Sequence, residues 1–181
     1  MMKKLSHEEI VESKLSVDAV RSKERAPIFV LLENIRSLHN VGAIFRTADG
    51  VMVEKIFLCG ITGQPPRSEI SKTALGAEEL VPWEYHDEAV EVVHDLKKRG
   101  VKIVAVELAH GAVDYTEAVY DFPACFIFGH EVEGVSDELM EEVDMAVKIP
   151  MFGRANSLNV ATCFGIIMYD VVHKLMKKDG K

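Results

Sequence analysis

The sequence has few cysteines and no long hydrophobic run. Its three cysteines, Cys59, Cys125 and Cys163, are odd in number and far apart, and none sits in a CxxC pair. This argues against a disulfide framework and against a cysteine-based zinc site. No apolar stretch approaches the roughly 20 residues that a membrane helix needs. The first residues, MMKKLSHEEIVESK, have two lysines close to the start but lack the apolar segment of a secretory signal. We therefore expect a cytoplasmic protein without a membrane span.

Several common site signatures are absent as well. The chain has no GxxxxGK[ST] and no GxGxxG, so neither nucleotide hydrolysis nor standard dinucleotide binding is supported. HExxH and paired Cys/His spacings are missing, which predicts that the protein holds no metal. The absence of GxSxG disfavours the nucleophile elbow of a hydrolase.

The charge is unevenly distributed along the chain. The formal net charge is −8, which by itself argues against a nucleic-acid partner. Residues 84–144, however, carry sixteen acidic and only four basic side chains, whereas both ends are neutral to basic. A polyanion can therefore still bind along the non-acidic surface, although strongly salt-dependent binding is not expected.

The order of predicted elements indicates the fold class. A length of 181 residues suits one domain. Strand-like runs occupy 28–32, 55–60, 101–108, 124–129 and 146–150. Helical spacing predicts helices over 6–24, 39–50, 88–100, 136–143 and 157–176, and residues 61–69, with two prolines, predict a loop. This alternation indicates an α/β fold with a mainly parallel sheet flanked by helices, in which ligands bind beyond the carboxyl ends of the strands.

Three segments could carry chemistry, and the first is HNVGAIFRTADG (39–50). On the predicted helix Arg46 points away from the apolar stripe and reaches over Gly42, and Asn40 at the helix start is expected to cap the backbone. A guanidinium, a carboxamide and free N–H groups suit a phosphate. The alternative is a surface arginine paired with Asp49 beside an ordinary cap, and this segment alone favours that alternative.

The second segment is FIFGHEVEGVS (126–136), in which a buried strand runs into Gly129 and a second glycine follows at Gly134. Glycine lets a ligand approach the backbone closely. Glu131 follows the strand end, where polar residues serve chemistry or orient loops, and His130 could be a titrating base. The alternative is a turn with solvated glutamates and an exposed histidine.

The third segment is KIPMFGRANSLNVATCFG (148–165), which is expected to turn at Gly153 and to start a long helix capped by Asn156 or Ser157. Asn159 would lie in the first turn and face the loop edge. The alternative is a well-capped core helix. Because this helix is apolar on more than one side, we expect a dimer contact, with a wide groove within a monomer as the alternative.

Together, the three segments resemble the SpoU (TrmH-like) family of the SPOUT class, which are RNA ribose 2′-O-methyltransferases. The matching patterns are N-x5-R, FG-x-E-x-x-G, IPM and SLN in this order, and they extend from about residue 28 to 175. One departure is His130, where family members more often carry Asn or Pro. The resemblance implies a C-terminal trefoil knot, bound S-adenosylmethionine and a homodimer. The acidic stretch 84–144 is compatible with a cationic sulfonium.

The resemblance also implies which residues form the site. The catalytic set would be Asn40, Arg46, Glu131, Ser157 and Asn159. The cofactor would be bound by Glu107, Leu108, Gly129, Ile149, Ser157, Leu158 and Asn159. Family proposals make the arginine the base. Since a guanidinium stays protonated, we favour a clamp that holds the target phosphate and stabilises developing alkoxide charge.

The substrate follows less directly from the sequence. The basic residues expected to ring the site and contact RNA are Arg25, Arg36, Arg67, Lys72 and Arg154, with ordinary solvated surface as the alternative for each. We expect residues 1–26 to form a helical extension and 27–181 to form the methyltransferase domain. We expect the substrate to be a structured RNA that is recognised by its shape, and this favours tRNA over rRNA. The alternatives are an rRNA 2′-O-methyltransferase, a non-catalytic RNA-binding protein of the same fold, and a methyltransferase that acts on a base nitrogen.

Overall fold

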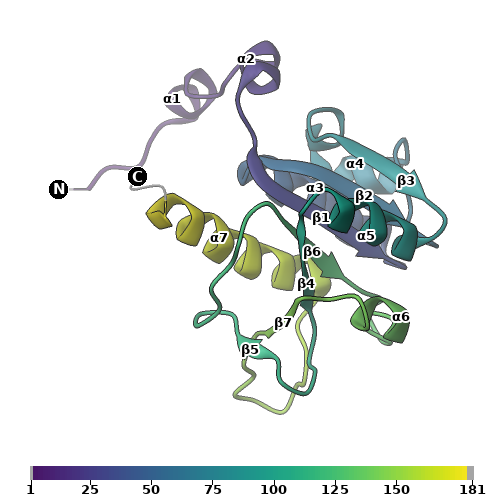
Figure 1. Cartoon of the computed structure of the whole chain (residues 1–181). Coiled ribbons are helices and arrows are strands. Elements are labelled where there is room, and N and C mark those ends of the chain that lie inside the picture. The colour runs from purple at the N-terminus through teal and green to yellow at the C-terminus, as the bar shows by residue number, and fades with distance from the viewer. Residues whose placement is uncertain (1, 179–181) are drawn as a thin grey trace.

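A computed structural model describes residues 2–178 of the chain. Its centre is a seven-stranded sheet in the order β3-β2-β1-β6-β4-β7-β5, and every neighbouring pair of strands is parallel (Figure 1). The strands are β1 (Ala26–Glu33), β2 (Val53–Cys59), β3 (Trp83–His86), β4 (Lys102–Val106), β5 (Val113–Asp114), β6 (Ala124–Phe128) and β7 (Met145–Lys148). The prediction of an α/β fold around a parallel sheet is confirmed.

Helices cover both faces of this sheet. The helices are α1 (His7–Glu12), α2 (Val17–Ser22), α3 (Leu38–Gly50), α4 (Ser68–Ala74), the 3-10 turn η1 (Ala77–Glu79), α5 (Ala89–Lys98), α6 (Asp137–Met140) and α7 (Val160–Lys178). Successive residues of β1 point to opposite faces, so Ile28 and Val30 pack with α3, α4 and α7, whereas Phe29 and Leu31 pack with α5 and α6. A strand buried on both faces explains the continuous apolar run at 28–32.

The N-terminal segment forms two short helices, so the prediction of one helix over 6–24 is wrong. The Ser6 hydroxyl accepts from the N–H of Glu9 while the Glu9 carboxylate accepts from the N–H of Ser6, a capping box that starts α1. The Ser16 hydroxyl caps α2 in the same way, which breaks the helical pattern between them. Neither helix buries a residue, and both are set apart from the sheet (Figure 1). The division of the chain at residue 26 stays a prediction.

The chain between β2 and α5 is more regular than expected. The two prolines of the predicted loop lie just before α4, so the loop ends earlier than residue 69. The edge strand β3 follows, and it escaped prediction because all four of its residues are only half-buried and two are polar. Parallel pairing of β3 with β2 extends the sheet to this edge.

The long helix α7 has two apolar stripes, and both pack largely within the chain. The first stripe contains Val160, Phe164, Ile167 and Val171, and the second contains Ala161, Gly165, Met168 and Val172. Phe164, Ile167 and Val171 of the first stripe are buried. In the second stripe Met168 is buried, and Val172 is partly buried against the same core. The alternative of a wide groove within one chain therefore accounts for both stripes. Exposed apolar side chains remain on the outer face of α7 at Tyr169 and Met176, which are 58% and 48% exposed.

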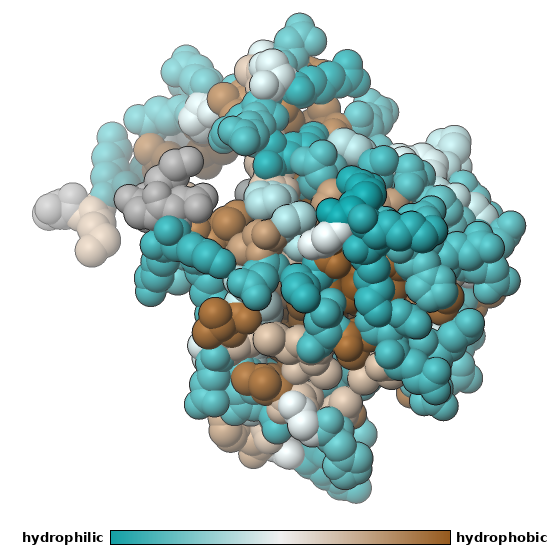
Figure 2. Space-filling view, in the orientation of Figure 1, coloured by the Kyte–Doolittle hydropathy of each residue, from teal (hydrophilic) through white to brown (hydrophobic). Residues whose placement is uncertain are grey.

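The face shown in Figure 2 is largely hydrophilic. Hydrophobic residues gather over its lower part, where β5, β7 and the chain leading into α7 lie (Figures 1 and 2). Within residues 2–178, none of the helices has both the length and the apolar character required to cross a bilayer.

Gly42 gives a direct test of the packing of α3 against α4. A Cβ at Gly42 would lie 2.1 Å from Thr73 Oγ1 and 2.3 Å from the Ile70 carbonyl oxygen. We expect Gly42→Ala to lower the free energy of unfolding by about 1–3 kcal/mol because the two helices must move apart. The control is Gly165→Ala in α7, where a Cβ meets nothing within 4 Å and should stabilise the helix by about 0.5–1 kcal/mol. Urea unfolding of both variants measures the difference, and equal stabilities would contradict this packing.

Candidate active site

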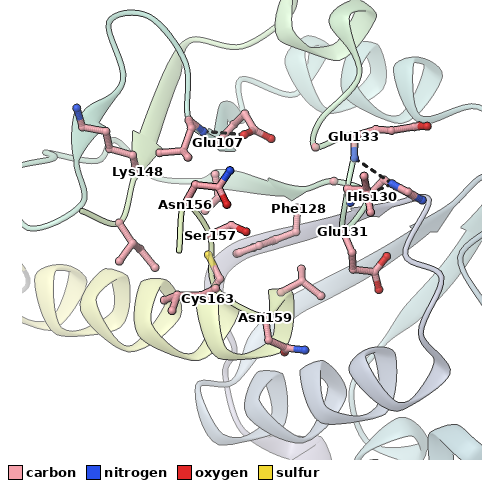
Figure 3. Close-up of a pocket in the computed structure, with 18 of the residues that line it drawn as sticks. Glu107, Phe128, His130, Glu131, Glu133, Lys148, Asn156, Ser157, Asn159 and Cys163 are labelled. Carbon is pink, nitrogen blue, oxygen red and sulfur yellow. Dashed lines mark hydrogen bonds between the residues drawn. The ribbon is translucent and has the colours of Figure 1, made fainter. Parts of the chain in front are cut away.

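All strands of the sheet end at the same edge, and a cavity of about 370 Å³ lies there beyond β4, β6 and β7. Its volume is within the range of roughly 300–1,000 Å³ typical of small-molecule sites. Its walls come from residues 106–108, from residues 128–134, from the chain between β7 and α7, and from Cys163 on α7. Figure 3 shows Asn156 and Ser157 directed into this cavity, with Glu131 and Asn159 on the side of α3. The segments FGHEVEGVS and KIPMFGRANSLNV therefore meet at this cavity.

The segment at the start of α3 joins them through a chain of three polar side chains. Asn40 Nδ2 donates to Glu131 Oε1 at 3.1 Å, and Asn159 Nδ2 donates to Asn40 Oδ1 at 3.0 Å. These residues are 91 and 119 positions apart in sequence. The three segments singled out in the sequence thus converge on one edge of the sheet.

The expected capping roles of two asparagines are wrong. Ser37, not Asn40, caps α3, because the Ser37 hydroxyl accepts from the Asn40 N–H. This leaves the Asn40 amide free for Glu131 and Asn159. At α7 the cap is neither Asn156 nor Ser157, since Asn159 Oδ1 accepts from the N–H groups of residues 161 and 162 at 2.9 and 3.3 Å. Asn159 therefore fixes the helix start with its oxygen and contacts Asn40 with its nitrogen.

Glu131 holds the start of α3 with both carboxylate oxygens. In addition to the Asn40 amide, it accepts from the N–H of Arg36 at 3.1 Å and from the N–H of Ser37 at 3.2 Å. Burial raises the pKa of Glu131, but these donors lower it by more, so the pKa lies below the usual value of a glutamate. The carboxylate is ionised at neutral pH and is a weak base, which suits it to positioning rather than to proton removal.

Two further carboxylates anchor the same loop. Glu107 Oε1 accepts from the N–H of Leu108 at 2.7 Å, and its Oε2 accepts from the N–H of Val135 at 3.0 Å. Glu33, which is buried at the end of β1, accepts from the N–H of Ser136 at 2.9 Å. Together with Glu131 we call them the anchoring carboxylates. They fasten residues 129–136 to the ends of β1 and β4 and to the start of α3.

All seven residues predicted to bind the cofactor line the cavity. They are Glu107, Leu108, Gly129, Ile149, Ser157, Leu158 and Asn159. At Gly129 a side chain has no room, because a Cβ would lie 2.2 Å from the Gly134 carbonyl carbon. In the chain between β7 and α7, residues 149–158 make no backbone hydrogen bond to any other residue in 2–178. Of these residues, 149, 151 and 156–158 line the cavity, and their unpaired N–H and C=O groups can bind a ligand or water.

Arg46 is placed differently from the rest of the predicted catalytic set. Its side chain is exposed on α3, does not line the cavity, and makes no hydrogen bond or ion pair with residues 2–178. The expected pairing with Asp49 is therefore absent. The prediction that the space over Gly42 is open is also wrong, because Ile70 and Thr73 of α4 fill this space. The guanidinium is available to a group outside the described chain.

Four of the five predicted RNA-contacting residues are exposed. Those four are Arg36, Arg67, Lys72 and Arg154. The prediction that Arg25 lies among the basic residues around the site is wrong. Its guanidinium donates to the carbonyl oxygens of Val53 at 3.1 Å and Leu80 at 2.8 Å. Val53 is the first residue of β2, so Arg25 lies at the amino edge of the sheet, opposite the cavity.

Sequence reasoning missed Cys163 as a cavity residue and missed the contacts of His130, which it gave only as a possible titrating base. Cys163 on α7 lines the cavity, and burial, with a smaller contribution from the charge of Glu107, raises its pKa to about 11. It is therefore a protonated thiol at neutral pH and a poor nucleophile. The His130 ring accepts two backbone hydrogen bonds within its own loop, which no spacing in the sequence indicates. Within residues 2–178, no three His, Cys, Asp or Glu side chains are grouped so that they could hold a metal ion.

The comparisons with known proteins agree with this geometry. The sequence model of the SpoU rRNA Methylase family matches residues 27–169. A tRNA (guanosine(18)-2′-O)-methyltransferase of Thermus thermophilus is 34% identical over 161 residues, which is 89% of this chain and 82% of the relative. The solved structure of the Aquifex aeolicus TrmH/SpoU tRNA modifying enzyme superposes with a TM-score of 0.81 at 31% identity, covering 91% of this chain and 84% of that one.

A second solved structure carries a ligand. It is an AdoMet-bound rRNA methyltransferase from Sinorhizobium meliloti, with a TM-score of 0.78 and 31% identity over 86% of this chain and 60% of that chain. The match of the family model over most of the chain, the relative with 34% identity and the shared fold lead to one assignment. The chain belongs to the SpoU rRNA Methylase family.

Proposed function

We propose that this protein is an S-adenosylmethionine-dependent RNA methyltransferase that transfers a methyl group to a ribose 2′-hydroxyl, with tRNA as the favoured substrate. The observation that carries the proposal is the hydrogen-bonded chain from Glu131 through Asn40 to Asn159 at the rim of the cavity. Family membership and the names of the relatives support the reaction and the preference for tRNA.

The cavity fits S-adenosylmethionine in charge and in hydrogen bonding. Three carboxylates line it, from Glu107, Glu131 and Glu133, against one lysine, Lys148, which suits a cationic ligand. The unpaired backbone of residues 149–158 can bind an adenine edge, and the apolar side chains of Leu108 and Leu158 offer contact surface. When bound, the cofactor supplies an electrophilic methyl group.

The residues of this chain position the ribose and stabilise its charge. Glu131 and Asn159 fix both ends of the Asn40 amide, and Ser157 faces the cavity beside them (Figure 3). A protonated guanidinium at Arg46 clamps the target phosphate and stabilises the negative charge that develops on the 2′-oxygen as the hydroxyl proton passes to solvent water. The protonated thiol of Cys163 does not compete for the methyl group.

The RNA surface extends from the cavity over exposed basic residues. Arg36 follows β1 next to Glu131, and Arg154 lies in the chain before α7 beside Phe152, which is 96% exposed. Cations bind the phosphate backbone, and an exposed aromatic ring can stack on an unpaired base. Arg67 and Lys72 on and beside α4 extend the surface past α3.

The proposal includes a homodimer, a trefoil knot and a cytoplasmic location. Exposed Tyr169 and Met176 on α7 support a contact with a second copy along this helix. The knot would lie in the C-terminal part of the sheet, and it is supported by the resemblance of the motif segments to the family. Light scattering of the wild type and of a Tyr169→Glu variant tests the dimer, which the variant should weaken.

The decisive experiment incubates the protein with methyl-labelled S-adenosylmethionine and, separately, with tRNA and rRNA. We expect label in tRNA, in nucleosides that carry the methyl group on the ribose. Label in rRNA alone would change the substrate, and label on a base would overturn the ribose assignment. Calorimetry with the cofactor completes the test, because absence of both binding and transfer would favour a non-catalytic RNA-binding protein.

A further inference from the structure

The loop that carries Glu131 is closed by the side chain of His130. The N–H of His130 donates to the Gly134 carbonyl oxygen and the N–H of Gly134 donates to the His130 carbonyl oxygen, both at 2.9 Å. Inside this turn, His130 Nδ1 accepts from the N–H of Val132 at 3.2 Å and from the N–H of Glu133 at 3.1 Å. Figure 3 shows the ring directed at the Glu133 N–H. One ring nitrogen thus satisfies two backbone donors.

This contact requires one protonation state of the ring. An imidazole nitrogen can accept only when it carries no hydrogen, so His130 must be neutral with its proton on Nε2. Protonation would place an N–H of the ring against the two backbone N–H groups of Val132 and Glu133. The turn would then lose both bonds, and the ring would be expelled from it.

We propose that His130 is a positioning residue that acts only as a neutral imidazole, by holding Glu131 in the orientation that Asn40 needs. Glu131 sits between the two ends of the turn, and its carboxylate reaches the N–H of Arg36, the N–H of Ser37 and the Asn40 amide. A turn that opens would release all of these contacts together. The inference rests on the proposed function only where methyl transfer is the readout.

Several charged groups lie on the same loop as the ring, contact that loop, or line the same cavity. Glu131 and Glu133 lie on its own loop, Glu107 comes from the end of β4, Lys148 comes from the end of β7, and Arg36 follows β1. The N–H groups of Val132 and Glu133 face Nδ1 of the ring from within the turn. Glu131 stays ionised over the mildly acidic range in which imidazoles take up a proton, because its pKa is lowered. A loss of function in that range therefore does not come from Glu131.

The first experiment needs neither cofactor nor RNA. Nitrogen-15 spectra of the histidine rings and hydrogen exchange of the Val132 and Glu133 amides are followed from pH 8 to pH 5. We expect an unprotonated Nδ1 at pH 8, and amide protection that falls as the ring takes up a proton. A hydrogen on Nδ1 at pH 8 would overturn the proposal. So would hydrogen-exchange protection of the two amides that stays constant while the ring becomes protonated.

The second experiment compares two replacements by single-turnover methyl transfer. In His130→Asn, Oδ1 can accept the same two bonds and does not titrate, so the rate at pH 8 should stay within about threefold of wild type and the acid loss should disappear. In His130→Ala, the acceptor is missing and the rate should fall about tenfold or more, with an unchanged cofactor dissociation constant. The control is His110→Asn, an exposed histidine outside the cavity lining.

The outcomes separate this inference from the proposed function. Equal rates for His130→Ala and wild type, or an acid loss that persists in His130→Asn, would refute the positioning role. A wild-type protein that methylates no RNA, while its amide protection follows the ring's protonation, would refute the methyltransferase and leave the turn as described. If His130→Ala does not fold, His130→Asn and the wild-type exchange data decide the question.

Discussion

Replacement of Arg46 by lysine is expected to slow methyl transfer about a hundredfold or more. Lysine keeps the positive charge but loses the planar fork that binds two oxygens of a phosphate and faces a developing alkoxide. Because the Arg46 side chain is exposed and bonded to nothing in residues 2–178, the melting temperature should not change. Single-turnover transfer with saturating cofactor and RNA measures the effect.

The pH dependence of the Arg46→Lys variant distinguishes a clamp from a base. A lysine loses its proton more readily than an arginine, so a base at this position would recover activity as the pH rises. A clamp would not recover. The control is Arg99→Lys. The Arg99 guanidinium lies 5.3 Å from the centroid of the Phe29 ring, and Phe29 belongs to the core cluster on the face of the sheet opposite α3. Near-normal turnover of Arg46→Lys at neutral pH would refute the clamp.

Glu131→Gln should lower the rate of methyl transfer about a hundredfold and also weaken the fold. Three donors converge on this carboxylate, and a glutamine offers them one oxygen and turns an NH₂ group toward the others. At least one of the three donors is then left without an acceptor, which costs about 1–3 kcal/mol of unfolding free energy. The control is Glu138→Gln on α6, an exposed residue outside the cavity lining whose carboxylate makes no hydrogen bond with residues 2–178.

The acid stability of the Glu131→Gln variant provides a second readout. The pKa of Glu131 is lowered on folding, so its ionised form stabilises the fold above the pH at which unfolded glutamates titrate. That contribution is lost as the pH falls through the lowered pKa. We expect urea unfolding of wild type and variant to differ at neutral pH and to converge in strong acid. A constant difference at every pH would contradict the role of the ionised carboxylate.

The core of the fold follows from sequence patterns, and the exceptions have local causes. The apolar run around Val30 predicts a strand buried on both faces, and the sheet has it at its centre. The break between α1 and α2 was missed because the helical spacing of apolar residues continues across it. Ser6 and Ser16 each cap a separate short helix, and this local capping decides the structure. The edge strand β3 was missed because a strand at the edge of a sheet does not need a continuous apolar run. Its half-buried residues, such as Glu84, show no hydrophobic periodicity in the sequence.

The candidate site was predicted in its residue types more than in its contacts. The motifs identify Asn40, Glu131 and Asn159, but their local positions suggest helix caps for Asn40 and for residues before Asn159. Partners about a hundred positions away decide the outcome, and spacing along the chain carries no information about them. Arg25 shows the same limit. A surface arginine and one that bonds two backbone carbonyls at the opposite edge look alike in sequence.

The two walls of the cavity differ in rigidity. The anchoring carboxylates fix residues 129–136 before any ligand arrives, whereas residues 149–158 have no backbone partner in the described chain. Residues 149–158 are therefore expected to lose more conformational entropy on binding than residues 129–136. We expect a sequence change in residues 149–158 to alter ligand affinity without touching Asn40, Glu131 or Arg46.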